Sequence, residues 1–224
     1  MSMLSNLELI RRVPLFTLLT TAQAESVADA VVKRRFKRGE PVVEQGQKSN
    51  TLYILLTGRA RVITADKRGR EVILATLQPG DYVGEMSLID NQAHSATVRA
   101  EVQTDMLALG RAEFARCLPE NSSMAYAIMK GLVQRLRQAD RKIESLALMD
   151  VYGRVARALL EFAQPGRDGQ LAVRDRISRQ DIAKMVGASR EMVSRVMKDL
   201  EERGFVETQE DGSMLIKEHL STLS

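Results

Sequence analysis

Residues 187–204 read GASREMVSRVMKDLEERG, and the pattern of this stretch decides the fold of the C-terminal part of the chain. At about 100° of rotation per residue, a helix over this stretch has two distinct sides. One side is apolar and carries Met192, Val193, Val196, Met197 and Leu200. The other side is polar and carries Arg190, Glu191, Ser194, Arg195 and Lys198. Two guanidinium groups and a carboxylate therefore meet near the N-terminal end of one helix face.

The flanking residues predict the elements on both sides of this helix. Ser178 and Ser189 are natural N-caps of two successive helices, and Gly187 can end the first of them in a left-handed conformation. Gly204 ends the second helix. The following stretch, FVETQEDGSMLI, predicts a two-stranded hairpin that turns at Asp211-Gly212. Helix, tight turn, helix and hairpin together predict a winged helix-turn-helix.

In a winged helix-turn-helix, the charged face of the second helix is placed to contact DNA. The first turn of the second helix meets base edges in the major groove of double-stranded DNA. Arginine is the two-pronged partner of guanine, and a carboxylate accepts from cytosine N4. Glu191 is the informative residue, because a surface that binds only phosphates gains nothing from an acid. We therefore expect Arg190, Glu191 and Arg195 to read bases; the alternative is a solvated helix face.

A single long helix is predicted upstream, over residues 120–150. Apolar residues recur there at steps of three and four, namely Ala125, Ile128, Leu132, Leu136, Ala139, Ile143 and Leu146. Two interpretations are compatible with this seam: a helix that lies on its own domain, or a coiled-coil dimer. The length favours the dimer, because about thirty helical residues exceed what a small domain can cover. The predicted dimer seam consists of Leu132, Leu136, Ile143 and Leu146.

The N-terminal part has the pattern of a β-structure. Glycines at 39, 46, 58, 69, 80 and 84 separate short β-branched runs, which is typical of a closed or sandwich architecture. The residues Lys67-Arg68-Gly69 join two of these runs as a hairpin would. Residues 7–16 and 24–32 are predicted as short helices. The expected fold class is α+β, with a sensor β-barrel at 1–118, a long helix at 119–149 and a DNA-binding domain at 150–224.

The composition narrows the possible functions. The chain has 224 residues, 28% charged, with a net charge of +4, which permits a nucleic-acid partner. Cys117 is the only cysteine, which excludes an intrachain disulfide and cysteine-ligated clusters and suits a reducing cytoplasm. His94 and His219 are the only histidines, so we expect no metal. No apolar run approaches 18 residues, so we expect no membrane span. No catalytic pairing or nucleotide-loop motif is present, so we expect no enzyme.

The sequence resembles the cyclic-AMP receptor protein and Fnr (Crp/Fnr) family of bacterial transcription regulators over nearly its whole length. The resemblance lies in RRFKRGEPVVEQG, TLYILLTGRARV, QPGDYVGEMSL, SATVRA, MDVYGRVA and, most specifically, SRQDIAKMVGASREMVSRVMKDLEERGFV. It implies a cyclic-nucleotide-binding β-barrel (a double-stranded jelly roll), a long dimerisation helix and a winged helix-turn-helix. The implied protein is a cytoplasmic homodimer.

The resemblance also implies roles for single residues in DNA binding. Arg190, Glu191 and Arg195 match the residues with which the family reads a TGTGA-type half-site. The residues that match its phosphate contacts are Arg179, Gln180, Ser189 and Lys198. RNA polymerase is an implied partner, and the basic run Lys33, Arg34, Arg35, Lys37 and Arg38 lies where the family can touch it; most such runs are solvated faces.

The sensor resemblance is incomplete. Gly84-Glu85 and Ser95 match the family's phosphate-binding cassette, in which the glutamate accepts from a ribose hydroxyl. The cassette is one residue shorter than in the cyclic-AMP-binding pattern, and His94 replaces the arginine that pairs the phosphate. Ala139-Asp140 replaces the Thr-Ser pair that contacts adenine, whereas Arg135 is kept and can pair with Glu85. The predicted effector pocket comprises Gly84, Glu85, His94, Ser95, Arg135 and Asp140.

Several interpretations of this pocket stay open. The effector can be cyclic AMP bound weakly, another cyclic mono- or dinucleotide, or absent altogether. Glu85 can contact a ligand or serve as a structural ion pair, and His94 can be a plain surface residue or a haem ligand. Fnr-type oxygen sensing needs a cysteine cluster that one cysteine cannot supply. If His94 charges near neutral pH, nucleotide binding should strengthen as the pH falls towards 6. A pure cyclic-nucleotide signalling module is a further alternative.

Overall fold

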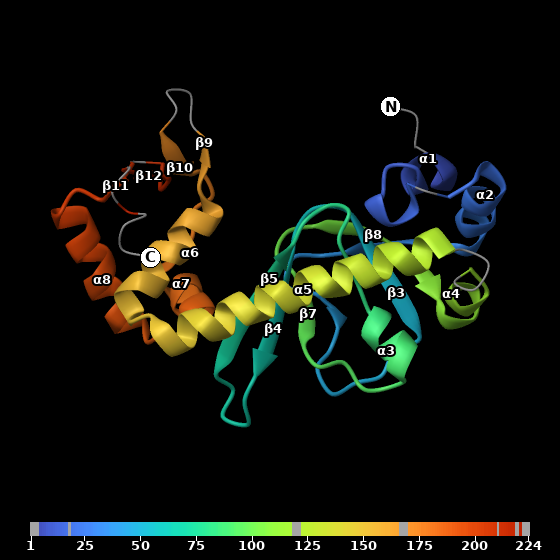
Figure 1. Cartoon of the computed structure of the whole chain (residues 1–224), viewed down its shortest axis with the longest axis horizontal. Helices are drawn as coiled ribbons and strands as arrows, with labels where there is room; N and C mark the ends of the chain where they lie inside the picture. The colour runs from blue at the N-terminus through green and yellow to red at the C-terminus, as the bar shows by residue number, and fades with distance from the viewer. Residues whose placement is uncertain are drawn as a thin grey trace. The chain divides into compact units, whose positions relative to one another are not determined.

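The computed structural model describes residues 5–17, 19–117, 122–165, 170–209, 211–217 and 220. The chain divides into two compact units, Met1–Arg135 and Leu136–Ser224, and most of their elements are labelled in Figure 1. The division falls inside the long helix α5 (Ser122–Leu148). The three-domain boundaries given above remain a prediction. Within the described ranges, every helix is too short or too polar to serve as a transmembrane segment.

The first unit is built on two antiparallel four-stranded sheets. One has the order β1 (Val32–Phe36), β8 (Thr104–Gly110), β3 (Thr51–Thr57), β6 (Tyr82–Val83). The other has the order β2 (Pro41–Val43), β7 (Thr97–Ala100), β4 (Ala60–Ala65), β5 (Glu71–Leu77). Buried side chains of both sheets, such as Leu55 and Val98, form one cluster. The sheets therefore pack face to face, which confirms the predicted β-sandwich and the α+β class.

The glycines predicted to end strands do so. All six of those singled out, at 39, 46, 58, 69, 80 and 84, have positive φ angles. The predicted hairpin is present, since β4 and β5 pair on both sides of Gly69. In its turn the Asp66 carboxylate accepts from the backbone N–H groups of Arg68 and Arg70 at 2.8 and 3.0 Å.

Helices cover the outer face of the first sheet. They are α1 (Asn6–Ile10), a 3-10 turn η1 (Pro14–Phe16), α2 (Thr21–Ala30), α4 (Arg111–Cys117) and the start of α5, while α3 (Glu85–Asp90) follows β6. The predicted helix over 7–16 is wrong in its length, because Pro14 lacks an N–H and begins a separate turn. The predicted helix over 24–32 ends at Ala30, since Val32 already pairs in β1.

The second unit is a winged helix-turn-helix, as predicted. It contains α6 (Val151–Phe162), β9 (Gln164–Pro165), β10 (Leu171–Val173), α7 (Arg179–Val186), α8 (Arg190–Glu202), β11 (Val206–Thr208) and β12 (Met214–Ile216). The sheet order is β11-β12-β10-β9. The strands β9 and β10 were not predicted, because two and three residues are too few to show a period. Val173 of β10 shares one buried core with Val155 of α6 and with Val193 and Leu200 of α8.

Helix α5 presents two faces that differ in burial. Met124 and Ile128 are buried in the core of the first unit, and Leu132 packs half-buried against it. Leu136 and Ile143 are 63% and 65% exposed. Leu132 therefore already packs in part against its own unit, and its predicted place in the dimer seam remains a prediction. At about 100° per residue, Leu132 is offset by about 40° from both Ile128 and Leu136, so it lies between the buried and the exposed face.

Candidate DNA interface and effector pocket

The turn between α7 and α8 is fixed by the capping residues that the sequence indicated. Ser178 Oγ accepts from the backbone N–H of Asp181 at 3.0 Å, and Gly187 ends α7 in the left-handed region with φ of 65°. Ser189 Oγ accepts from the backbone N–H of Met192 at 3.2 Å. Both N-caps and the glycine C-cap are thus confirmed. They set the direction in which α8 leaves the turn.

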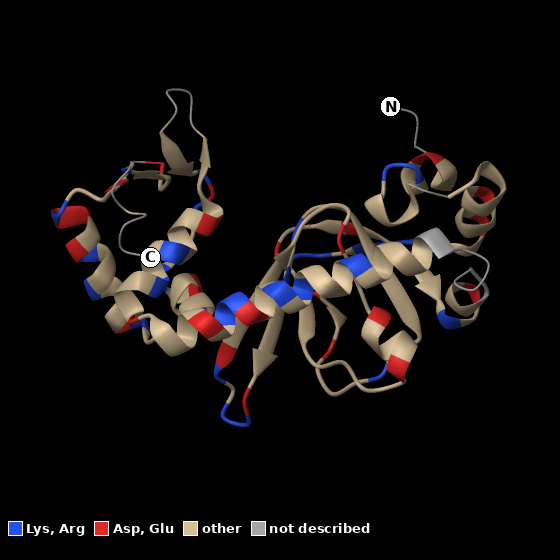
Figure 2. Ribbon diagram, in the orientation of Figure 1, with Lys and Arg blue, Asp and Glu red and all other residues tan. Residues whose placement is uncertain are grey.

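The polar face of α8 is free of the core. Val193, Met197 and Leu200 are fully buried, which leaves the three predicted base-reading residues, Arg190, Glu191 and Arg195, on the exposed side. Ser194, also exposed, donates its hydroxyl hydrogen to the Arg190 carbonyl at 2.8 Å. Figure 2 shows residues of both charges along this helix. An exposed arc of mixed charge in the first turns of a second helix is the arrangement that base reading requires.

The Glu191 carboxylate is held in its charged form. Its own backbone N–H and then the Ser189 hydroxyl lower its pKa from the ordinary value, and the charges of Arg190 and Arg195 act in the same direction. At neutral pH the group is therefore only a hydrogen-bond acceptor. This is the state that an amino group on a base edge would meet.

The four residues predicted to contact phosphates have different surroundings. Gln180, Ser189 and Lys198 are exposed, and Lys198 lies 3.5 Å from Glu202. Arg179 donates from Nη2 to Glu201 Oε1 at 2.9 Å, and the same oxygen accepts from Thr208 Oγ1 at 2.7 Å. Glu201 thus connects the start of α7 to the wing. The sequence contained no signal for this link, because its members are 22 and 7 residues apart.

Gly84 sits at the predicted effector pocket, before the first residue of α3. Its φ is 96°, and a Cβ atom there would collide with the carbonyl oxygen of Thr51. Only glycine meets both conditions. This close approach of backbone to backbone places Glu85 at the start of α3, against the neighbouring helix α5.

The buried Glu85 forms an ion pair with the partly exposed Arg135, as the sequence suggested. Glu85 is 1% exposed, and its Oε1 accepts from Arg135 Nη1 at 2.6 Å. Arg135 also donates to the Tyr82 carbonyl and lies 5.0 Å from the centre of the Tyr82 ring. Burial raises the pKa of the Glu85 carboxyl, and the Arg135 charge opposes that rise. Glu85 Oε2 is buried and makes no hydrogen bond among the described residues.

His94 is buried and bonded on both sides of its ring. It is 9% exposed; Nδ1 lies 3.1 Å from Ser87 Oγ, and Nε2 lies 2.8 Å from Ser49 Oγ. The alternative of a plain surface residue is therefore wrong. Burial lowers the pKa of His94 below its ordinary value, so the imidazole is neutral at pH 7. Burial therefore opposes the charging of His94 near neutrality that the sequence suggested.

The remaining predicted pocket residues, Ser95 and Asp140, are exposed. Ser95 is exposed in the loop before β7. Asp140 is an exposed residue of α5 beyond the division between the two units, and its assignment to the pocket remains a prediction. Cys117 and His219 add nothing here, since the Cys117 side chain and all of His219 lie outside the described residues. Among the described residues, no three His, Cys, Asp or Glu side chains are grouped as metal ligands would be.

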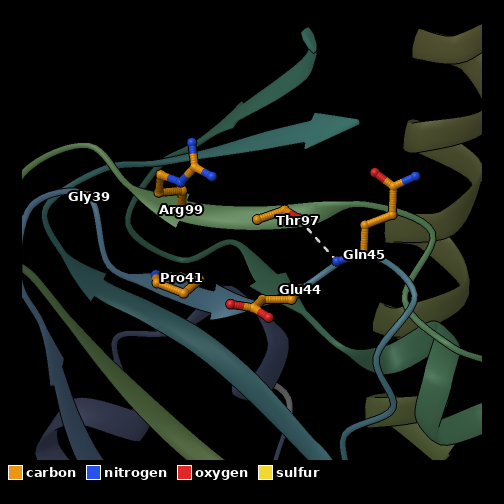
Figure 3. A pocket seen from close by; sticks show the side chains of 6 residues that line it. All are labelled: Gly39, Pro41, Glu44, Gln45, Thr97 and Arg99. Atoms are coloured by element: carbon orange, nitrogen blue, oxygen red, sulfur yellow. Dashed lines mark hydrogen bonds between the residues drawn. The ribbon is translucent and has the colours of Figure 1, made fainter. Parts of the chain in front are cut away.

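A separate open hollow lies over the paired strands β2 and β7. Gln45 N donates to Thr97 Oγ1 at 3.0 Å (Figure 3). Arg99 lies 3.5 Å from Glu71. The lining of the hollow is Gly39, Pro41, Glu44, Gln45, Thr97 and Arg99. None of the predicted pocket residues belongs to it, so the hollow and the candidate effector pocket are different places.

The basic residues of β1 and of the turn that follows it are exposed, at Lys33, Arg34, Arg35, Lys37 and Arg38. Arg35 Nε donates to Asp105 on the neighbouring strand at 2.6 Å. The run is therefore accessible to a partner, and one of its charges is already paired within the sheet.

The burial of His94 predicts how the stability of the first unit depends on pH. Because the folded-state pKa lies below the unfolded value of about 6.5, the unfolded chain binds more protons as the pH falls. The free energy of unfolding should be flat above that value and fall below it. We expect urea unfolding of His94→Gln between pH 8 and 5 to show a shallower fall than wild type. Parallel curves for the two proteins would contradict this assignment.

Comparisons with known proteins agree with the geometry. The cyclic nucleotide-binding domain model matches residues 33–121, and the Crp-like helix-turn-helix domain model matches residues 153–219. The cAMP-activated global transcriptional regulator Vfr of Pseudomonas aeruginosa is 36% identical over 183 residues, which cover 78% of this chain and 84% of Vfr. The cAMP-activated global transcriptional regulator CRP of Escherichia coli O157:H7 is 34% identical, over 74% of this chain and 80% of CRP.

Solved structures show the same architecture. The c-di-GMP responsive global regulator CLP of Xanthomonas campestris superposes with a TM-score of 0.76 at 27% identity, over 88% of this chain and 98% of that one. FixK2 of Bradyrhizobium japonicum shares the fold, with a TM-score of 0.74 at 22% identity, over 87% of this chain and 97% of that one. With a sensor-type sandwich and a winged helix-turn-helix in one chain, and relatives that match both, this chain belongs to the Crp/Fnr family of DNA-binding transcriptional regulators.

Proposed function

We propose that this regulator binds, as a homodimer, to palindromes of TGTGA-type half-sites, and that Arg190, Glu191 and Arg195 read the bases. The observation that carries the proposal is the exposed arc of α8, where two guanidinium groups flank a carboxylate held in its charged form. The arginines suit guanine O6 and N7, and Glu191 suits cytosine N4. A helix that only bound phosphates would repel them with Glu191.

The predicted phosphate contacts surround this arc. Ser189 caps α8, Lys198 is exposed two turns later, and Gln180 is exposed on α7. Arg179 gives one N–H to Glu201, but a guanidinium has five, so donors remain for a phosphate. The bond to Glu201 would hold the side chain in one orientation. These contacts set the register on DNA and carry no sequence information.

A second copy of this chain is the partner that the exposed face of α5 requires. Leu136, Ile143 and Leu146 are each more than half exposed along one helix. Large apolar residues repeated along a helix are usually covered by another helix. A two-fold dimer would also present two copies of α8 to half-sites one or more turns of DNA apart, about 34 Å for one turn.

The candidate effector pocket offers an acceptor for the sugar of a cyclic nucleotide but no cation for its phosphate. Glu85 Oε2, buried and without a partner, would accept from a sugar hydroxyl. The cyclic phosphate would find no cation at position 94, because His94 is neutral and already bonded to Ser87 and Ser49. We therefore propose that cyclic AMP binds weakly and that DNA binding is measurable without it. CLP, a structural neighbour, is described as c-di-GMP responsive, and a cyclic dinucleotide is the corresponding candidate here.

The Glu85–Arg135 pair offers a route from the pocket to the dimer helix. Arg135 belongs to α5, which continues to Leu148. A ligand hydroxyl that competes for Glu85 would change how firmly Arg135 holds that helix, and so shift the packing of two copies of α5. The second candidate is a regulator controlled by its abundance alone, which the internally satisfied His94 favours. In either case the proposed site of action is the cytoplasm, with RNA polymerase as a partner.

Base reading predicts different losses for the three variants. Arg190→Ala or Arg195→Ala should weaken binding to a TGTGA palindrome by about 1–3 kcal/mol and flatten the preference at one guanine. Glu191→Ala should relax discrimination with a smaller loss of affinity, because it also removes repulsion from phosphates. Titrations against specific and random duplexes at one salt concentration measure both effects. Equal losses on both duplexes for all three variants would remove the assignment.

The dimer proposal is tested at the exposed face of α5. Leu136→Glu should yield monomers, because a charge buried in an apolar seam is strongly destabilising. The matched control is Gln138→Glu, the same charge on an exposed position outside the seam, which should leave the dimer intact. Sedimentation velocity measures the association state, and circular dichroism checks the fold. An intact Leu136→Glu dimer would show that the seam lies elsewhere.

The effector proposal is tested by calorimetry and DNA titration with cyclic AMP, cyclic GMP and cyclic di-GMP. Wild type should bind cyclic AMP weakly. His94→Arg should bind it about ten- to a hundredfold more tightly, since a charged hydrogen bond contributes about 1.5–3 kcal/mol. Micromolar binding of cyclic AMP by wild type would contradict the proposal. No gain from arginine would show that the pocket is not a site for a cyclic monophosphate.

A further inference from the structure

Met192 departs from the pattern of its own helix. The sequence places it on the apolar side of α8, yet it is 45% exposed, whereas Val193, Met197 and Leu200 on that side are fully buried. Val196 packs against the core of the second unit, and Met192 is not among the residues that do. A large part of this apolar side chain in the first turn of α8 is thus exposed to solvent.

The position of Met192 limits the roles that its side chain can have. It is the third residue of α8, its backbone N–H donates to the Ser189 cap, and Arg195, three residues later, is offset by about 60° around the helix axis. In a helix-turn-helix, this first turn is the part that meets base edges. A thioether has no hydrogen to donate, so Met192 cannot hold a phosphate. It contributes neither to the core nor to binding the DNA backbone.

One feature of the major groove matches an exposed thioether chain. The C5-methyl group of thymine is the apolar group that a base edge presents there, and apolar side chains read it by contact. Methionine is unbranched and flexible, so it can fit a methyl group without fixed geometry. Covering both groups would also remove from water the apolar surface that Met192 exposes in the free protein.

We propose that Met192 is a further base-reading residue, which contacts the methyl group of one thymine in each half-site beside the base pair read by Arg195. The contact sets a preference for thymine at that position, which arginine and glutamate cannot provide. The inference rests on the proposed binding to TGTGA-type half-sites and adds a specificity-determining residue to it.

The experiment removes the methyl group and nothing else. In a TGTGA palindrome, each thymine of the half-site and of its complement is replaced in turn by deoxyuridine. Wild type should lose about fourfold in affinity at one position, the equivalent of about 0.8 kcal/mol for one buried carbon. Met192→Ala, which removes the contact in both half-sites, should bind the normal palindrome about fifteenfold more weakly and lose nothing further at that deoxyuridine. Met192→Leu, which keeps an apolar chain, should retain the sensitivity.

The controls separate this inference from the function on which it rests. Because Met192 is exposed, Met192→Ala should unfold at the wild-type temperature, and deoxyuridine outside the half-sites should change nothing. If wild type prefers the palindrome but tolerates every deoxyuridine, the inference is wrong and the proposed function stands. The same holds if Met192→Ala keeps the full penalty, since the methyl group then meets another residue. If wild type binds palindrome and random DNA equally, both are wrong.

Discussion

The ion pair between Glu85 and Arg135 is the interaction on which the sensor unit depends. A carboxylate that is 1% exposed is tolerated only with a partner, and a buried charge that loses its partner typically costs about 3–5 kcal/mol. Gly84 sets the start of α3 by its approach to the Thr51 backbone, and Arg135 meets Glu85 from α5. The Tyr82 ring and hydroxyl complete the contact with that helix, the hydroxyl by a bond to the Ile128 carbonyl at 3.2 Å. Strand β6, helix α3 and helix α5 are therefore held together around this ion pair.

The same point supports the proposal that the candidate pocket binds cyclic AMP only weakly. Glu85 has one oxygen committed to Arg135 and the other without a partner, so the acceptor for a sugar hydroxyl is ready. Both ring nitrogens of His94, by contrast, are already bonded, one to the Ser87 hydroxyl and one to the Ser49 hydroxyl. A neutral imidazole with both nitrogens bonded cannot replace a guanidinium that carries a charge and five donors. The fold of the sensor is thus retained while its phosphate chemistry is altered.

In the DNA-binding unit, the packing of the hydrophobic core determines which face of α8 is exposed. Val193, Met197 and Leu200 are buried, and their spacing fixes the rotation of α8 about its axis. That rotation exposes Arg190, Glu191 and Arg195 together. Glu201 then joins Arg179 of α7 to Thr208 of the wing. Base recognition in this unit depends on packing behind the helix as much as on the side chains in front of it.

The elements that the sequence predicted well are those set by local chemistry. Ser178, Gly187 and Ser189 act on backbone groups within four residues, and a 3.6-residue period shows which side of α8 is apolar. Such signals are complete within a short stretch of chain. Pro14 shows their limit, since one missing N–H divided a helix that hydrophobic periodicity had extended to Phe16.

By itself, the sequence determined the order and type of most elements, the family, and which residues form the polar face of α8. Only the tertiary structure decided that His94 is buried, that Leu132 packs in part against its own unit, that Glu201 bridges helix and wing, and that Met192 is left exposed. These properties concern accessibility and partners. They depend on segments that are distant in the chain and adjacent only after folding, so no pattern within one stretch contains them.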